Sequence, residues 1–133
     1  MVIGNSKRLL FAATLATAFL AAPALAKELT GTLKKIKDTG GISLGHRESS
    51  IPFSYYDDKQ QVIGYSQDLM MKVVEAIKAD LKMAKIDIKM LPVTSSNRIT
   101  LIQNGSIDIE CGSTTNNTER QKQVSFSNTI FII

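Results

Sequence analysis

The three arginines that follow Ala26 each lie beside a turn rich in serine and threonine. They are Arg47, Arg98 and Arg120, against eleven lysines in the same part of the chain. A guanidinium presents a planar fork that binds a carboxylate through two hydrogen bonds, whereas a lysine ammonium is a solvated point charge. A lysine-rich chain that keeps arginine for such turns indicates carboxylate recognition, and chance placement of three arginines is the alternative.

The stretch Thr94 to Lys122 contains two of these turns. The pattern predicts that Thr94 or Ser95 caps a short helix, with Arg98 in its first turn and an end at Asn104-Gly105. The N-terminus of a helix favours an anion and disfavours a cation unless an anion is nearby. We therefore expect an anion beside Ser95 and Arg98.

The second turn of this stretch follows a strand expected over residues 107–111, whose apolar side chains share one face. Ser113 and Thr115 are two residues apart, so their hydroxyls point the same way in an extended loop. Thr118 or Asn117 is then expected to cap a short helical turn that contains Arg120. This turn is a second candidate binding loop.

Arg47 follows a short apolar strand expected over residues 42–45. Ligands of α/β proteins usually bind at the carboxyl ends of such strands, which places Arg47 for function. His46 beside it is a possible ligand or base, although a lone histidine at a strand end is more often structural. Glu48 is an alternative partner that would neutralise Arg47.

The remaining elements alternate between helical and extended patterns. A helix that Gly40 stops, a long helix capped by Ser66, and a strand over residues 86–93 provide the frame. Apolar residues at helical spacing in the long helix predict its buried stripe: Leu69, Val73, Ile77 and Leu81, with Met70 and Val74 beside them. The pattern predicts an extended aromatic segment over residues 52–58, with a returning extended segment over 62–65. Further extended structure is expected over residues 124–127 and 128–133.

The segment from Met1 to Ala26 has the pattern of a secretory signal peptide. Lys7 and Arg8 precede a predominantly apolar run of twelve residues, 9–20, and Ala24-Leu25-Ala26 offers a cleavage site after Ala26. The apolar run is shorter than the roughly 20 residues that span a bilayer, which disfavours a membrane anchor. The expected mature part, residues 27–133, is a single domain in an exported compartment.

The mature part carries 14 basic and 12 acidic residues, scattered lysines and no tryptophan. It therefore predicts no nucleic-acid partner. We also expect no cofactor and no metal. Cys111 is the only cysteine and His46 the only histidine, so a catalytic Cys/His pair is a formal alternative to a buried thiol.

Four stretches resemble a known family: GHRESSIPFSYYD at 45–57, GYSQDL at 64–69, TSSNR at 94–98, and DIECGSTTNNTERQKQVSFS at 108–127. They are similar to the first lobe of family 3 extracellular solute-binding proteins, in particular the periplasmic glutamate/aspartate-binding components of ABC importers. The resemblance implies an α/β fold of the type II periplasmic-binding-protein kind, with a central sheet flanked by helices. It also implies an apparent truncation after Ile133, near the first interlobe crossing, with the second lobe missing.

The resemblance further implies a role for each candidate residue. Arg120, Ser113 and Thr115 would hold the α-carboxylate of an amino acid. The side-chain carboxylate of glutamate or aspartate would be held by a second group: Arg47, Ser95 and Arg98. The partners expected are that ligand and an ABC transporter membrane permease, with the binding protein a monomer in the periplasm.

A non-catalytic binding protein is one hypothesis that follows. The other is a periplasmic enzyme on the same fold, such as a dehydratase or a lobe associated with a murein hydrolase, with His46 or Glu48 as acid/base. Binding of a dicarboxylate without turnover favours the first hypothesis, and turnover favours the second. A single lobe offers an open half-site, so we expect residues 27–133 alone to bind weakly or undetectably.

Overall fold

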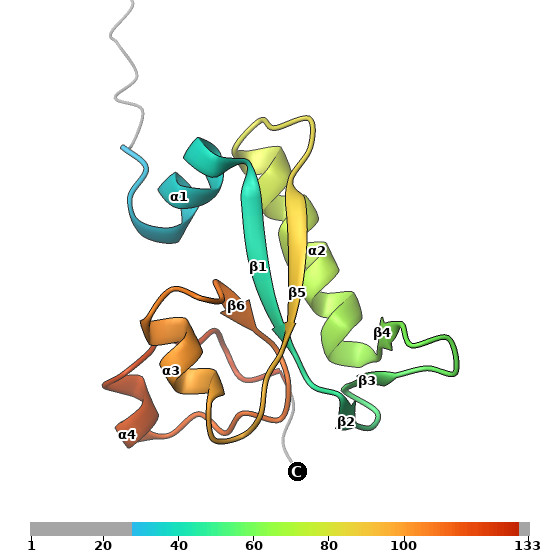
Figure 1. The fold of residues 1–133 in the computed structure, drawn as a ribbon. Helices are drawn as coiled ribbons and strands as arrows, with labels where there is room; N and C mark the ends of the chain where they lie inside the picture. Colours follow the sequence, from blue (N-terminus) through green and yellow to red (C-terminus); the bar gives the residue numbers. More distant parts are fainter. Residues whose placement is uncertain (1–27, 131–133) are drawn as a thin grey trace, which may run out of the picture.

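The computed structural model describes residues 28–130 (Figure 1). A parallel sheet contains three strands in the order β5 (Asp87–Pro92), β1 (Gly41–His46) and β6 (Ile109–Glu110). A small antiparallel sheet contains β2 (Ser49–Ser50), β3 (Ser54–Tyr56) and β4 (Val62–Ile63). The helices are α1 (Gly31–Thr39), α2 (Tyr65–Asp80), α3 (Arg98–Gln103) and α4 (Thr118–Gln121). The α/β class predicted from the sequence is confirmed.

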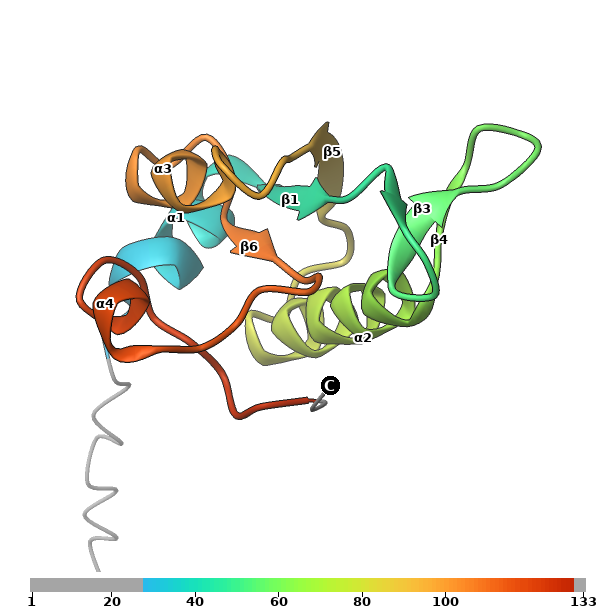
Figure 2. The same ribbon diagram turned by 90° about the horizontal axis from the view of Figure 1, so that it is seen from below.

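The parallel sheet separates two helical layers. Figure 2 shows α2 on one side of β1 and β6, and α3 on the other. The buried core on the α2 side joins α1, the sheet and α2 through Ile36, Ile42, Leu44, Met70, Val74, Leu81 and Ile86. Ile109 and Cys111 pack against this cluster, as their shared face predicts. Ile107, which the alternation placed on the same face, is buried outside this cluster.

The buried face of α2 is rotated from the predicted stripe. Met70 and Val74 are fully buried, whereas Val73 is 38% exposed and Leu69 and Ile77 are half-buried. Leu81 lies just after the helix and is buried, as expected. Met70, Val74 and Ile77 follow helical spacing as well as the predicted set does, so periodicity alone could not choose between two adjacent stripes.

The start of α2 also differs from the prediction that Ser66 is its cap. The cap residue is Gly64, and Ser66 lies inside the first turn, fully buried. A Cβ on Gly64 would lie 2.5 Å from the carbonyl oxygen of Phe53, and φ is +119° there. A glycine is required because the backbone of Pro52 and Phe53, just before β3, packs directly against the helix start.

The helix predicted after Ser95 begins later than expected. Residues 95–97 form a turn, in which the backbone N–H of Thr94 donates to the Asn97 carboxamide oxygen at 2.8 Å. The helix α3 then begins at Arg98 and ends before Asn104. Asn97 is the residue before the helix and forms no side-chain cap bond. The Thr94 hydroxyl accepts a hydrogen bond from the Asn97 backbone N–H at 3.2 Å, so Thr94, one of the two predicted caps, caps the turn that leads into α3. The predicted end at Asn104-Gly105 is confirmed.

The last described part of the chain contains less strand than predicted. The strand expected over residues 107–111 is reduced to β6, and residues 124–130 form no strand. Asn117 caps α4 and its side chain accepts a hydrogen bond from the Arg120 backbone N–H, which settles the choice between Asn117 and Thr118. The predicted signal segment and residues 131–133 lie outside the described residues. Across residues 28–130, no helix combines the length and apolar character needed to cross a membrane.

Candidate functional site

The candidate residues meet because three neighbouring strands run parallel. β1 ends at His46, β5 at Pro92 and β6 at Glu110. The segments that leave these strands carry Arg47, the turn before α3, and the loop 112–117. Since parallel strands end at one edge of a sheet, the three segments converge there. The topology thereby brings together segments that lie far apart in the sequence.

Ser95 lies between two guanidinium groups. Its hydroxyl oxygen accepts a hydrogen bond from Arg47 Nη1 at 2.9 Å and another from Arg98 Nη2 at 2.8 Å. Both arginines also have a buried Nε without a hydrogen-bond partner among the described residues. The three residues that the sequence analysis assigned to one carboxylate are therefore in direct contact, and two guanidiniums keep unused donors there.

Arg98 is buried and paired with an acid. It is 4% exposed, and its Nη1 donates to Glu110 Oε1 at 3.2 Å and to the Thr114 hydroxyl. The Thr114 hydroxyl in turn donates to Glu110 Oε2 at 2.8 Å. Burial lowers the pKa of Arg98, Glu110 counteracts this, and the nearby charges of Arg47 and Arg120 lower it further. All three arginines thus lie within electrostatic range of one another.

The anion expected beside Arg98 is, in this structure, Glu110. Arg98 was expected at a helix N-terminus, where a cation is disfavoured unless an anion is nearby, and this predicted a neighbouring anion. The carboxylate of Glu110 supplies it at 3.2 Å, and Ser95 binds arginine side chains instead of capping the helix. The inference of an anion was correct, but it did not foresee that the protein provides one itself.

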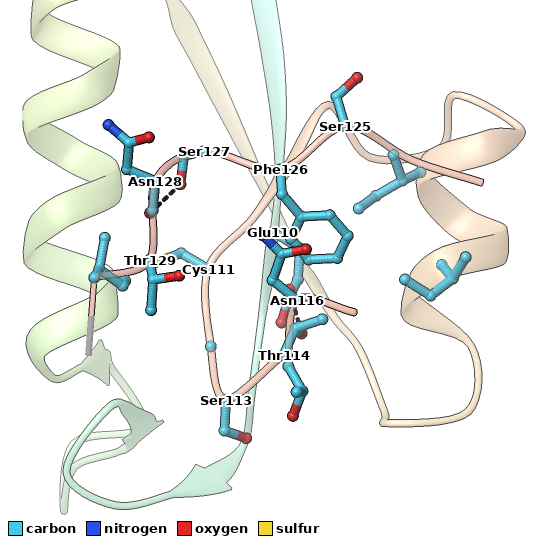
Figure 3. A pocket seen from close by; sticks show the side chains of 15 residues that line it. Glu110, Cys111, Ser113, Thr114, Asn116, Ser125, Phe126, Ser127, Asn128 and Thr129 are labelled. Atoms are coloured by element: carbon cyan, nitrogen blue, oxygen red, sulfur yellow. Dashed lines mark hydrogen bonds between the residues drawn. The ribbon is translucent and has the colours of Figure 1, made fainter. Parts of the chain in front are cut away.

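The group expected to hold the α-carboxylate is more loosely arranged. Arg120 Nη1 donates to the backbone carbonyl of Thr115 at 2.9 Å, and the side chains of Ser113 and Thr115 are exposed. Ser113 and Thr115 line a pocket of about 350 Å³ between the loop 112–116 and residues 125–130. Figure 3 shows this pocket, in which the Ser113 hydroxyl points away from Phe126. None of the three arginines lines it, so the assignment of Ser113, Thr115 and Arg120 to one carboxylate stays a prediction.

The residues considered for acid/base or thiol chemistry have other surroundings. His46 is buried and its ring packs edge-on against Tyr56, with 5.5 Å between the ring centres. Glu48 is exposed, and the acid that pairs with an arginine in the described part of the chain is Glu110. Burial raises the pKa of the Cys111 thiol, which keeps it protonated at neutral pH. These surroundings favour structural roles for His46 and Cys111.

Sequence reasoning did not name Glu110 or Thr114 as members of the site. The available signal was strand alternation: with Ile109 and Cys111 facing the core, Asp108 and Glu110 must face elsewhere. An acid on that face, just before a hydroxyl-rich loop, is a candidate partner for an arginine. Among residues 28–130, no cluster of three or more histidine, cysteine, aspartate or glutamate side chains could hold a metal ion.

The fold is similar to that of a solved amino-acid-binding protein. A solved structure of the ancestral amino acid-binding protein AncCDT-1, described as a precursor of cyclohexadienyl dehydratase, matches with a TM-score of 0.64 and 28% sequence identity. The match covers 74% of this chain and 40% of that protein. The fold is thus the type II periplasmic-binding-protein fold predicted from the sequence.

The chain belongs to the bacterial extracellular solute-binding proteins, family 3, whose sequence model matches residues 42–132. It is 58% identical over 123 residues to the L-glutamate/L-aspartate-binding protein of Pseudomonas aeruginosa, covering 92% of this chain and 41% of the relative. It is 55% identical over 125 residues to the glutamate/aspartate import solute-binding protein of Escherichia coli, covering 94% of this chain and 40% of the relative. The chain therefore spans about two fifths of the length of these relatives, and both are named as binding proteins, not as enzymes.

Proposed function

We propose that this chain is the first lobe of a periplasmic protein that binds glutamate or aspartate and delivers it to the membrane permease of an ABC importer. The observation that carries the proposal is the shared contact of Arg47 and Arg98 with Ser95, at 2.9 and 2.8 Å. Two guanidiniums fixed around one hydroxyl form a receptor for a carboxylate. The names of the relatives from Pseudomonas aeruginosa and Escherichia coli support the same ligand class.

The charges of the site support a ligand with two carboxylates. Arg47, Arg98 and Arg120 interact electrostatically, and Glu110 offsets one of their charges. Two positive charges remain uncompensated within this group. In the proposed complex, Arg47, Ser95 and Arg98 bind the side-chain carboxylate, and the loop with Ser113, Thr115 and Arg120 binds the α-carboxylate.

The direct test is a titration of the chain with glutamate, aspartate and glutamine up to millimolar ligand concentrations. Amide NMR spectra monitor the titration. A single lobe leaves the ligand exposed to water, so we expect weak binding in which the two acids shift signals around Ser95 and Ser113. A fusion of this chain to the part of the Pseudomonas aeruginosa relative that it does not match provides the closed site. Calorimetry on that fusion is expected to give tight binding of both acids.

The proposal assigns the discrimination between acid and amide to Arg47. Arg47→Met should weaken glutamate binding to the fusion by about tenfold or more, since it removes a charge-assisted hydrogen bond, and weaken glutamine binding less. Lys59→Met, a change of an exposed cation in the turn of the β3–β4 hairpin, is the matched control. Equal binding of glutamate and glutamine by the unchanged fusion, or no binding of either acid, would refute the proposed function.

The proposed location depends on the segment from Met1 to Ala26 acting as a cleaved signal peptide. Expression of the whole chain in a bacterium and N-terminal sequencing of the exported product should give a chain that begins at Lys27. Analytical ultracentrifugation of that product should give a monomer. A product that keeps Met1 and stays with the inner membrane would contradict this part of the proposal.

A further inference from the structure

Glu110 is the buried acid that pairs with Arg98. It is the last residue of β6, its side chain is 4% exposed, and each of its carboxylate oxygens has a partner. Oε1 accepts from Arg98 and Oε2 accepts from the Thr114 hydroxyl. The proposed function assigns this residue no contact with the ligand, so its burial beside Arg98 needs its own explanation.

Gly112 leaves the space that the Glu110 carboxylate fills. A Cβ on Gly112 would lie 2.8 Å from Glu110 Oε1 and 3.2 Å from Arg47 Cγ, so a side chain there would force one of these groups to move. Gly45, in β1, lies on another side of Glu110, and a Cβ there would meet Glu110 Cγ at 3.4 Å, an ordinary contact distance. The loop backbone at Gly112 is thus closely packed against the carboxylate and the adjacent Arg47 stem.

A purely stabilising ion pair does not explain this arrangement well. Desolvation of two charges largely cancels their attraction, so buried pairs contribute little net stability. The contacts instead fix a direction: Glu110 and Thr114 bind Nη1 of Arg98, which leaves Nη2 at Ser95 and the buried Nε without a partner in the described residues. A guanidinium held at one nitrogen in this way presents its other donors in one orientation.

We propose that Glu110 is a positioning residue that sets the ligand preference of the site. It holds the Arg98 fork against Ser95, so that the fork is presented to a carboxylate in a fixed orientation. This inference rests on the proposed function for the nature of the ligand. Glu110 acts through Arg98 and Thr114 and does not contact the ligand.

Asp108 provides a matched control within the same segment. It lies two residues before Glu110, its side chain is also 4% exposed, and it forms an ion pair at 2.9 Å with Lys35, whose side chain is exposed. It also accepts a hydrogen bond from the Ser43 backbone N–H at 2.9 Å. Asp108→Asn therefore removes an equally buried acid without touching the arginines.

The first experiment measures the position of Arg98 directly, without ligand. The Nε–H signal of Arg98 in a nitrogen–proton NMR spectrum of the chain should be sharp and exchange slowly, because this group is buried. Glu110→Gln should shift and broaden it and speed its exchange by about tenfold, since a charge-assisted hydrogen bond that orders the side chain is lost. Asp108→Asn should leave the signal unchanged. An Arg98 signal unaffected by Glu110→Gln would overturn the proposal.

The second experiment measures ligand preference in the fusion described above. Glu110→Gln should lower the ratio of glutamate to glutamine affinity by about tenfold, the worth of one well-oriented charged hydrogen bond. Thr114→Val keeps every charge and should also lower the ratio, but by a smaller factor. This variant replaces Glu110→Gln as the test if Glu110→Gln fails to fold. Asp108→Asn should lower stability and leave the ratio unchanged.

The possible outcomes separate this inference from the proposed function. An unchanged fusion that prefers glutamate, with the same ratio in Glu110→Gln and Thr114→Val, refutes the positioning role and leaves the proposed function standing. An unchanged fusion without amino-acid binding refutes the proposed function, and the Arg98 signal then still decides whether Glu110 positions that side chain. A fall in the ratio that Asp108→Asn also produces would reduce the effect to general destabilisation and overturn the inference.

Discussion

Arg98 and Arg120 follow neighbouring turns at one edge of the sheet, yet they are held by different kinds of contact. Arg98 is buried among Ser95, Glu110 and Thr114, and its partners are side chains from three segments. Arg120 is half-buried and its guanidinium donates to one backbone carbonyl five residues earlier. A network of side chains can fail at any member, whereas a local contact with the backbone depends on little else. The comparison predicts that substitutions around Arg98 lower the free energy of unfolding far more than substitutions around Arg120.

The largest expected effect follows removal of Arg98. Arg98→Met leaves the buried Glu110 carboxylate without its cation, which should lower the free energy of unfolding by about 3–5 kcal/mol. Arg120→Met removes one hydrogen bond near the surface and should cost about 1 kcal/mol. Urea denaturation of both variants measures the difference. Similar costs for the two variants would remove the contrast between the two halves of the site.

A smaller loss of stability is expected when the space beside Glu110 is filled. Gly112→Ala places a methyl group 2.8 Å from Glu110 Oε1, so the carboxylate or the loop must move. Overpacking of this kind should lower the free energy of unfolding by about 1–3 kcal/mol. Gly41→Ala is the control, because a Cβ there would meet its nearest neighbour, the Asp87 carbonyl oxygen, at an ordinary 3.6 Å. Equal stability of the two variants in the same denaturation experiment would show that Glu110 has room to move.

The turn that carries Arg120 is tested at the cap of α4. Asn117→Ala removes the side-chain oxygen that accepts from the Arg120 backbone N–H at 2.9 Å. Loss of such a cap should cost about 1 kcal/mol and should loosen the turn that carries Arg120, measured as faster amide hydrogen exchange at residues 118–121. Asn116→Ala, which removes an exposed contact with Gln121, should have a smaller effect. The signals of Arg98 should not respond to either change.

The smallest effect is expected at Cys111, which follows Glu110 and packs against the hydrophobic core. Burial is the main cause that raises the pKa of its thiol above the ordinary 9.0. Because the folded protein holds the proton more tightly than the unfolded chain does, this group stabilises the fold below pH 9.0 and the contribution is lost as pH rises further. The rate of labelling by a thiol reagent should therefore rise with a midpoint above that value. A midpoint at or below it would place the thiol in a polar environment.

Much of the frame was predictable because its signals are local. Gly40 stops α1 in the left-handed conformation, with φ of +73°, as a glycine after a helical pattern indicates. Alternation predicted β5, and the apolar run before Arg47 predicted β1. The turns at the strand ends were predicted as the binding edge, and the parallel strands do bring Arg47, Ser95 and Arg98 together.

The errors arose where contacts between distant residues decide the outcome. The start of α2 is set by the approach of Phe53 to Gly64, which no pattern within the helix reveals. The buried face of α2 depends on how it packs against α1 and the sheet, so Met70 and Val74 of the predicted stripe are fully buried, whereas Val73 is exposed. Glu110 was missed because its partner Arg98 is twelve residues away and meets it only after β6 joins the sheet.

The hydroxyl of Ser95 carries one further consequence. A serine oxygen has two lone pairs, and here each receives an N–H, one from Arg47 and one from Arg98. Only its proton is left to form a bond, so with these contacts in place Ser95 can donate but not accept. A neighbouring group must therefore offer an oxygen lone pair, and an ammonium or the NH₂ side of an amide would find no acceptor at this position. The polarity of a single hydroxyl is thus set by the two cations on either side of it.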